Sequence, residues 1–133
     1  MASIFTRIVN REIPAHIVAE DQNHIAFLDI NPLTIGHTLA IPKKEVDYIY
    51  DLSDDELIAL QLFAKKVAKS IETVVSCERI GTAVIGLEVP HAHIHLIPIK
   101  NMDDMNFSRP KLKLTHDELA LTAKIISDDF SNS

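Results

Sequence analysis

Residues 91–97 of the chain, HAHIHLI, decide how the rest of the sequence is interpreted. Histidine and apolar side chains alternate with a period of two, which is the pattern of a half-buried β-strand. His91, His93 and His95 would then share one face, and the apolar residues would face the core. Histidine is a weak core-former whose ring nitrogens need hydrogen-bond partners, so three on one face predict a functional site. Imidazole suits metal binding, acid–base or nucleophilic chemistry, and pH sensing.

A single metal ion does not fit all three histidines of an unbent strand. Strand residues rise about 3.3 Å each, so His91 and His95 would lie roughly 13 Å apart along the backbone. Zinc holds its nitrogen ligands at about 2.0–2.1 Å. A row of imidazoles better matches an extended polyanion such as a phosphate chain, where one ring attacks phosphorus and its neighbours donate hydrogen bonds or protons. A metal held by two of the histidines and another ligand is the alternative.

Composition limits the classes of protein that need consideration. The chain has 133 residues, 47% of them hydrophobic, which predicts one folded domain over residues 1–133. A formal net charge of −6, without a run of lysine or arginine, argues against a nucleic-acid duplex or an anionic membrane as partner. The apolar runs are too short to span a bilayer, and no signal peptide is visible. With Cys77 as the single cysteine, we expect no internal disulfide, an inert thiol and a cytoplasmic location.

Local patterns predict an α+β fold, with helices segregated from an antiparallel sheet. Two helix starts carry a capping box, in which Ser53 pairs with Glu56 and Thr115 with Glu118. The first is followed by a long amphipathic pattern to about residue 75, and the second by a C-terminal helix over about residues 115–130. Strands are expected at residues 16–20, 24–28, 38–41, 80–85 and 89–98.

Two further blocks accompany the histidines: FLDINP at residues 27–32 and GHTLAIPK at residues 36–43, and Gly86 and Val89-Pro90 precede His91. In this order and spacing, over about residues 4–100, the chain resembles the histidine triad (HIT) family of nucleotide hydrolases and transferases. The resemblance implies a HIT-like antiparallel sheet with one long helix and a C-terminal helix. It also implies a homodimer.

The resemblance assigns the chemistry to four histidines. His93 would be the nucleophile that attacks the α-phosphorus of a nucleotide and forms a nucleotidyl-histidine, which water then hydrolyses. Attack requires a neutral imidazole, and neighbouring histidines oppose its protonation. His95 would assist the leaving group, and His91 and His37 would fix the geometry. The reaction implied by the resemblance needs no metal and no cofactor.

The nucleotide-binding residues also follow from the resemblance. Asp29 matches the ribose ligand of the family, because a carboxylate can accept hydrogen bonds from two hydroxyls. Phe27 and Ile30 would form an apolar wall for a base, with a purine nucleotide as the expected substrate. The phosphate side of the site would be formed by three consecutive residues, Gly86, Leu87 and Glu88.

The chain departs from the family pattern in ways that affect function. Many relatives carry glutamine at the position of Leu87 and asparagine near Ile80. The side chains of Leu87 and Ile80 cannot donate a hydrogen bond. Relatives with a structural zinc carry cysteines where this chain has Ser3 and Thr6, so we expect no zinc. The leaving group stays open among an amine, a sulfate and a second nucleotide. The alternative function is a nucleotide-binding regulatory module with weak or vestigial catalysis.

Overall fold

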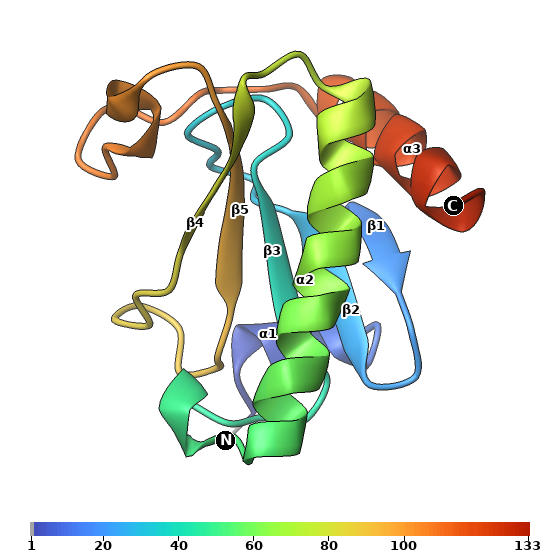
Figure 1. Cartoon of the computed structure of the whole chain (residues 1–133), viewed down its shortest axis with the longest axis vertical. Coiled ribbons are helices and arrows are strands. Elements are labelled where there is room, and N and C mark those ends of the chain that lie inside the picture. Colours follow the sequence, from blue (N-terminus) through green and yellow to red (C-terminus); the bar gives the residue numbers. More distant parts are fainter. Residues whose placement is uncertain (1) are drawn as a thin grey trace.

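A computed structural model describes residues 2–133 and contains one antiparallel sheet of five strands in the order β1-β2-β3-β5-β4 (Figure 1). The fold is therefore α+β, as predicted. In chain order the elements are α1 (Ile4–Val9), β1 (Ile17–Glu20), β2 (His24–Leu28), β3 (Thr38–Pro42), the 3-10 helix η1 (Ile49–Asp51), α2 (Asp54–Val74), β4 (Arg79–Ala83), β5 (Ile94–Ile99), the 3-10 helix η2 (Met102–Met105) and α3 (His116–Ser131).

Both predicted capping boxes form and set the starts of the two long helices. At α2 the Ser53 hydroxyl accepts a hydrogen bond from the Glu56 amide at 3.2 Å, and the Glu56 carboxylate accepts one from the Ser53 amide at 2.9 Å. Thr115 and Glu118 make the same pair of bonds at α3. Each box satisfies two amides that the first helical turn leaves without intrahelical partners. Of the helices within residues 2–133, none is long and apolar enough to cross a membrane.

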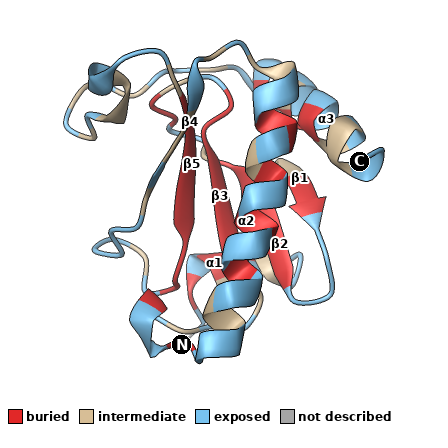
Figure 2. Cartoon of the chain, viewed as in Figure 1, coloured by how far each residue is buried: buried red, intermediate tan, exposed pale blue. Residues whose placement is uncertain are grey.

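The sheet separates two apolar clusters. The larger one lies under α2 and α3 and contains Ile94 and Leu96 of β5 with buried residues of both helices (Figures 1 and 2). The smaller one lies on the other face, where Phe5 of α1 packs against residues such as Phe27 and Leu39. Because Ile94 and Leu96 point towards α2, the alternation of the strand sends His95 to the face of α1, and His93, just before the strand, contacts Phe5 on the same face. The predicted division of side chains between the two faces is confirmed.

The predicted bounds of the triad strand are wrong. Strand β5 begins at Ile94 rather than at residue 89, and β4 ends at Ala83 rather than at residue 85. The pairing of β4 with β5 accounts for the end of β4 and the start of β5, because its last pair is Ala83 opposite His95. The segment between them is irregular, and Gly86 adopts a φ of +74°. His91 and His93 therefore lie in the approach to the strand rather than in it.

His24, interpreted from the sequence as a solvated edge residue, is buried. Its Nδ1 lies 2.9 Å from a carboxylate oxygen of Asp21, and its ring stacks on Phe63 with centroids 5.1 Å apart. The local pattern showed only the turn beside it. The stacking partner lies on α2 and is brought there by tertiary packing.

Candidate active site

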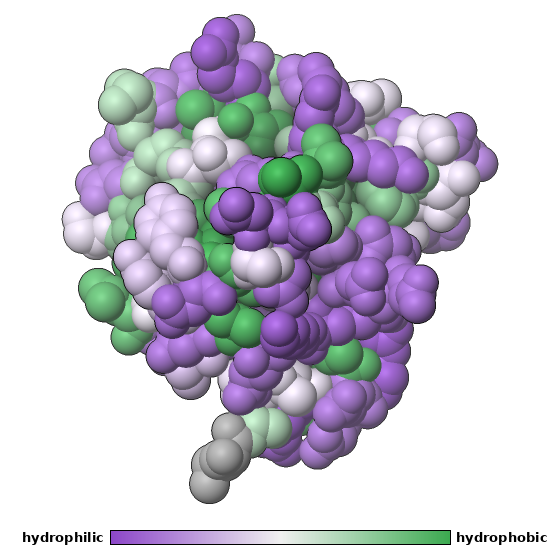
Figure 3. Space-filling view, turned by 60° about the horizontal axis from the view of Figure 1, so that its bottom comes forward, coloured by the Kyte–Doolittle hydropathy of each residue, from purple (hydrophilic) through white to green (hydrophobic). Residues whose placement is uncertain are grey.

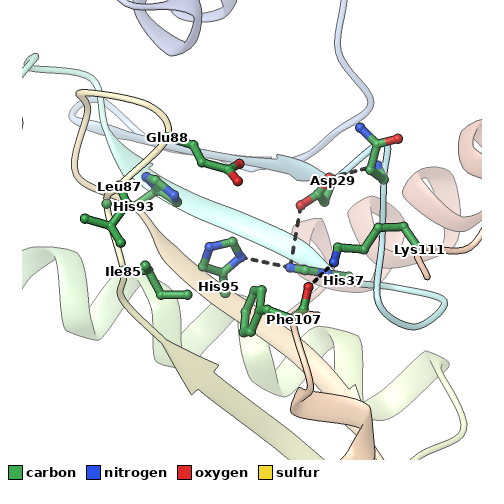
Figure 4. A pocket seen from close by; sticks show the side chains of 11 residues that line it. Asp29, His37, Ile85, Leu87, Glu88, His93, His95, Phe107 and Lys111 are labelled. Carbon is green, nitrogen blue, oxygen red and sulfur yellow. Dashed lines mark hydrogen bonds and ion pairs between the residues drawn. The ribbon is translucent and has the colours of Figure 1, made fainter. Parts of the chain in front are cut away.

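One pocket on the α1 face of the sheet gathers most of the predicted catalytic residues (Figure 4). His37 comes from the start of β3, His95 from β5, and His93 from the approach to β5. The pocket is lined by Asp29, Asn31, His37, Ile85, Gly86, Leu87, Glu88, His93, His95, Phe107 and Lys111. Segments around residues 29–37, 85–95 and 107–111 thus meet at one place.

The backbone fixes which nitrogen of His93 can act as a nucleophile. Its Nδ1 lies 2.7 Å from the carbonyl oxygen of His91. A carbonyl only accepts, so Nδ1 must carry the proton and Nε2 keeps a free lone pair. The ring is held edge-on against Phe5, with centroids 5.1 Å apart, and against His95 at 5.0 Å. The hydrogen bond therefore selects the tautomer of His93 in which Nε2 is the nitrogen that can react.

A second hydrogen-bonded series orders the protons of His37 and His95. The amide of Leu33 donates to His37 Nδ1 at 3.0 Å, so the proton of His37 is on Nε2. That nitrogen lies 2.9 Å from Nδ1 of His95 and donates to it, which leaves the proton of His95 on its Nε2 (Figure 4). His95 thus retains an N–H group that is not used in this series. The amide of one loop residue determines the tautomers of two histidines.

Burial keeps both of these rings neutral. Burial, together with the smaller effects of the neighbouring His95 and Lys111, lowers the pKa of His37 from the usual 6.5 to about 3. Burial likewise lowers the pKa of His95 to about 4, with His93 as the second cause. Phe107 contributes to this burial, because its ring centroid lies 5.0 Å from that of His95. Near neutral pH the pair therefore carries no charge.

Asp29 is held at the edge of the pocket. One carboxylate oxygen accepts a hydrogen bond from the Asn31 amide at 2.8 Å, and the other lies 3.7 Å from Nε2 of His37. Burial raises the pKa of Asp29 above its usual value. An aspartate before Asn31-Pro32 could also serve only to form the turn. In the structure it both forms the turn and lines the pocket.

Asp29, His37 and His95 bring one ligand atom each within 4.8 Å of one another, which is compact enough to consider a metal ion. The hydrogen bonds argue against that use. The Nδ1 of His37 already accepts from Leu33, so its Nε2 could ligate a metal only after losing its remaining proton. The group also contains just one of the three triad histidines. The arrangement fits an ordered series of neutral imidazoles better than the metal alternative.

His91 does not line the pocket. It is fully buried, its Nε2 donates to the carbonyl oxygen of Pro42 at 2.8 Å, and its Nδ1 accepts from the Ser3 hydroxyl at 2.9 Å. The His91 carbonyl orients the ring of His93, as its predicted supporting role would require, and that role stays a prediction. Through Ser3, the contacts of His91 connect the start of α1 with the segment that precedes β5.

The surroundings of His91 do not suit zinc. Thr6 donates its hydroxyl hydrogen to the Glu45 carboxylate at 2.6 Å, and the Ser3 amide donates to the same oxygen at 2.6 Å. These bonds hold the pKa of Glu45 at about 2. Two neutral hydroxyls replace the thiolates that a structural zinc site requires. The polar contacts of Ser3, Thr6, Glu45 and His91 instead form a hydrogen-bonded cluster.

The predicted binding residues divide into two groups. Gly86, Leu87 and Glu88 line the pocket, and the positive φ of Gly86 is a conformation that other residues rarely adopt. Phe27 and Ile30 do not line this pocket: Phe27 is buried against Phe5, with ring centroids 5.3 Å apart, and Ile30 is 64% exposed. Their role as a wall for a base stays a prediction.

Comparisons with known proteins agree with this geometry. A family model, the HIT domain, matches residues 10–102. The chain belongs to the HIT family. A HIT-like protein of Methanocaldococcus jannaschii is 42% identical over 102 residues, which cover 71% of this chain and 77% of that protein. The adenosine 5′-monophosphoramidase hnt1 of Schizosaccharomyces pombe is 32% identical over 130 residues, covering 96% and 97% of the two chains.

Solved structures of other HIT proteins share the fold. A Hit-like protein of Bartonella henselae superposes with a TM-score of 0.82 at 29% identity and covers 96% of this chain and 95% of its own. A histidine triad nucleotide-binding protein of Sulfolobus tokodaii also gives a TM-score of 0.82, at 30% identity, with coverage of 96% and 91%. The likeness extends over α3, beyond the region of the family match.

Four pocket residues were missed by the analysis of the sequence. Asn31 and Ile85 adjoin residues that the HIT resemblance had assigned, so their neighbourhood was a usable signal. Phe107 and Lys111 lie after residue 102, outside the family match, in a polar connection that had no distinctive pattern. Only the path of the chain after β5 brings them to the histidines.

Proposed function

We propose that the protein is a nucleotide hydrolase or nucleotidyl transferase that acts at the α-phosphate of a nucleotide through a nucleotidyl-histidine on His93. The substrate would be a nucleoside monophosphate ester, a nucleoside phosphoramidate or a dinucleoside polyphosphate. The observation that carries the proposal is the hydrogen bond from His93 Nδ1 to the His91 carbonyl. It leaves Nε2 as a free nucleophile in a pocket shared with a second proton-bearing imidazole.

In the first half of the proposed reaction, Nε2 of His93 attacks the α-phosphorus and forms a P–N bond. The bond from phosphorus to the leaving group breaks, and its electron pair stays on the leaving atom. The Nε2–H of His95 stabilises the charge that develops there. The proton of His93 stays on Nδ1 and is donated to the His91 carbonyl oxygen, and this hydrogen bond stabilises the positive charge of the substituted ring. In the second half, water attacks the phosphorus and forms a P–O bond, and the P–N bond breaks and returns its electron pair to Nε2. The proton that the water loses balances the one that the departed leaving group takes from solvent.

Two observations support a purine nucleotide as substrate. Both yeast relatives, from Schizosaccharomyces pombe and Saccharomyces cerevisiae, are named adenosine 5′-monophosphoramidases. Asp29 lies at the pocket edge with one oxygen free of the Asn31 amide, as contact with ribose hydroxyls would require. An amine is accordingly the first leaving group to test, followed by sulfate and a second nucleotide.

The test is a screen of adenosine and guanosine phosphoramidates, adenosine phosphosulfate and dinucleoside polyphosphates with the wild type and His93→Ala. We expect wild-type turnover and a covalent adduct that mass spectrometry maps to His93. His93→Ala should lose turnover by several orders of magnitude while still binding nucleotide, because the ribose contact remains. If His93→Ala keeps more than a few per cent of the wild-type rate, His93 is not the nucleophile.

The second candidate function is a nucleotide-binding regulatory module. It is favoured by one observation: Leu87 lines the pocket where a side-chain donor to phosphate would be useful, and it has none. Nucleotide binding without turnover of any substrate in the screen would select this function. Adduct formation on His93 would reject it.

We also propose that the protein works as a cytoplasmic homodimer. Strand β4 is an outer edge of the sheet. A hollow beside it is lined by exposed apolar and aromatic side chains, among them Tyr48, Tyr50, Ile85 and Leu87, whereas much of the surface in Figure 3 is hydrophilic. An exposed edge and an apolar patch together favour association with a second copy. Light scattering should give twice the mass of the chain at micromolar concentration, and a monomer alone would contradict the proposal.

A further inference from the structure

The pocket contains carboxylates where a nucleotide needs positive charge. Asp29 and Glu88 line it, and Leu87 offers no donor. Ile80, the other position without an expected amide, packs against the core under α2. A phosphate bound here would meet two negative groups and few side-chain donors. Positive charge from elsewhere in the chain is therefore needed for strong phosphate binding.

That charge comes from the strap, the segment of residues 100–115 that connects β5 with α3. Lys111 is the cation among the described residues that line the pocket. It reaches in beside His37 and Asp29 (Figure 4). The strap lies almost entirely beyond the family match, which ends at residue 102. The residues matched by the HIT domain therefore do not include Lys111.

The strap is attached to the loop that orders the histidines. Arg109 donates from Nη2 to the Leu33 carbonyl at 2.7 Å, and the Leu112 amide donates to the Pro32 carbonyl at 2.9 Å. The guanidinium of Arg109 is itself held by Asp104 at 3.1 Å. Leu33 thus accepts from Arg109 with its carbonyl and donates to His37 with its amide. Lys111 lies between two of these attachment points, so its backbone has a defined position next to the catalytic histidines.

The ammonium group of Lys111 is oriented but not neutralised. It donates to the carbonyl oxygens of Phe107 and Arg109. An ammonium has three N–H groups, so one remains for a ligand. The ion pairs found within residues 2–133 do not include Lys111. A held, half-buried cation without a carboxylate partner, in a pocket that needs positive charge, is suited to an anionic ligand.

We propose that Lys111 is a phosphate-binding residue of this site, and that the strap supplies a charged donor to phosphate where Leu87 and Ile80 offer no side-chain donor. The ligand is a phosphate group of the bound nucleotide, so the residue distinguishes a nucleotide from a nucleoside. This inference rests on the proposed function for the identity of the ligand as a nucleotide. It adds a residue outside the HIT match to the binding site.

The test compares the affinities for AMP and adenosine, and for GMP and guanosine, by calorimetry. The variants are Lys111→Met, which removes the charge, Lys111→Gln, which keeps a donor for the strap carbonyls, and Lys111→Arg, which keeps the charge. Lys113→Met is the matched control, because Lys113 lies on the same strap but is exposed and does not line the pocket. Thermal unfolding of each variant shows whether the strap remains folded.

Loss of the charge should weaken monophosphate binding about tenfold to a hundredfold, as expected for a charge-assisted hydrogen bond, and leave nucleoside binding unchanged. Lys111→Arg should recover part of the affinity, and Lys113→Met should match the wild type. Added salt should weaken monophosphate binding to the wild type more than to Lys111→Met. A role limited to tethering the strap would instead lower the affinities for nucleotide and nucleoside together.

The inference is overturned if Lys111→Met and Lys111→Gln keep the wild-type ratio of monophosphate to nucleoside affinity. It is also overturned if the wild type binds monophosphate no better than nucleoside. The measurement requires no turnover, so it separates this inference from the proposed function. Lys111-dependent phosphate binding without an adduct on His93 would reject the enzyme and keep the inference, and the reverse result would reject the inference alone.

Discussion

Ser3→Ala is the substitution that tests how His93, the proposed nucleophile, is held in place. The Ser3 hydroxyl caps α1 by accepting from the Thr6 amide at 3.0 Å, and it donates to Nδ1 of the fully buried His91 at 2.9 Å. His91 in turn orients His93 through its carbonyl oxygen. Alanine removes the cap and leaves His91 without its donor, while it changes the volume of the side chain very little.

The expected cost follows from these two contacts. Loss of a serine cap costs about 0.5–2 kcal/mol of the free energy of unfolding. A buried acceptor left without its donor costs about 1–3 kcal/mol. Thr6 Oγ1 lies 3.3 Å from the same nitrogen, but it could replace the lost donor only by giving up its hydrogen bond to the Glu45 carboxylate. We therefore expect Ser3→Ala to destabilise the protein by about 2–4 kcal/mol.

The assay is urea denaturation of Ser3→Ala beside Ser53→Ala, together with kcat on the best substrate from the screen. Ser53 is the matched control, because it caps α2 through the Glu56 amide but is exposed and contacts no histidine. Ser53→Ala should cost about 1 kcal/mol and leave kcat unchanged. Ser3→Ala should cost more and lower kcat, because the His91 carbonyl is less firmly held. Equal costs for the two variants, with equal kcat, would refute the idea that the cluster around His91 supports the nucleophile.

The other predictions concern the phosphate, the ribose and pH. Leu87→Gln should raise kcat on a phosphoramidate by up to about a hundredfold if the amide reaches the developing charge. Its free energy of unfolding should change by less than about 0.5 kcal/mol, because Leu87 is 89% exposed. If the variant is as stable in urea as the wild type and its kcat is unchanged, the idea that the site lacks a donor at position 87 is rejected. Asp29→Asn should weaken binding of AMP about tenfold and leave a 2′,3′-dideoxy analogue unaffected, so equal losses in calorimetry would contradict ribose contact. Stability should fall as pH drops below 6.5, because the unfolded chain then takes up protons that buried His37 and His95, with pKa values of about 3 and 4, do not. The slope is at most about 1.4 kcal/mol per pH unit for each histidine, and equal urea midpoints at pH 7 and pH 5 would argue against these low pKa values.

The structure decides one question that strand alternation left open, whether Leu87 packs in the core or faces the site. The segment before β5 is irregular, so the period of two does not extend to residue 87. Leu87 is exposed and lines the pocket, while Val89 packs against the cluster around Phe5. The alternative in which Leu87 packs in the core is therefore excluded, and the substitution with glutamine tests function rather than stability.

What the sequence determined by itself rests on short-range physics. Capping boxes at Ser53 and Thr115 depend on side chains three residues away, so the starts of α2 and α3 were predictable. The alternation at residues 94–97 likewise placed Ile94 in the core and His95 on the opposite face. The blocks at residues 27–43 and 86–97 were sufficient to indicate the HIT family, which the family match confirms.

What only the tertiary structure decided depends on groups far apart in the chain. Strand β5 begins at Ile94 because its pairing with β3 starts at the Ala40–Ile94 pair and its pairing with β4 at the Ala83–His95 pair, which no local pattern reports. The tautomers of His37 and His95 follow from the amide of Leu33, and their low pKa values follow from burial. Lys111 enters the pocket because the strap bonds to the loop of Leu33. A hydrogen bond or a buried charge is set by distance in space, and the sequence alone gives only distance along the chain.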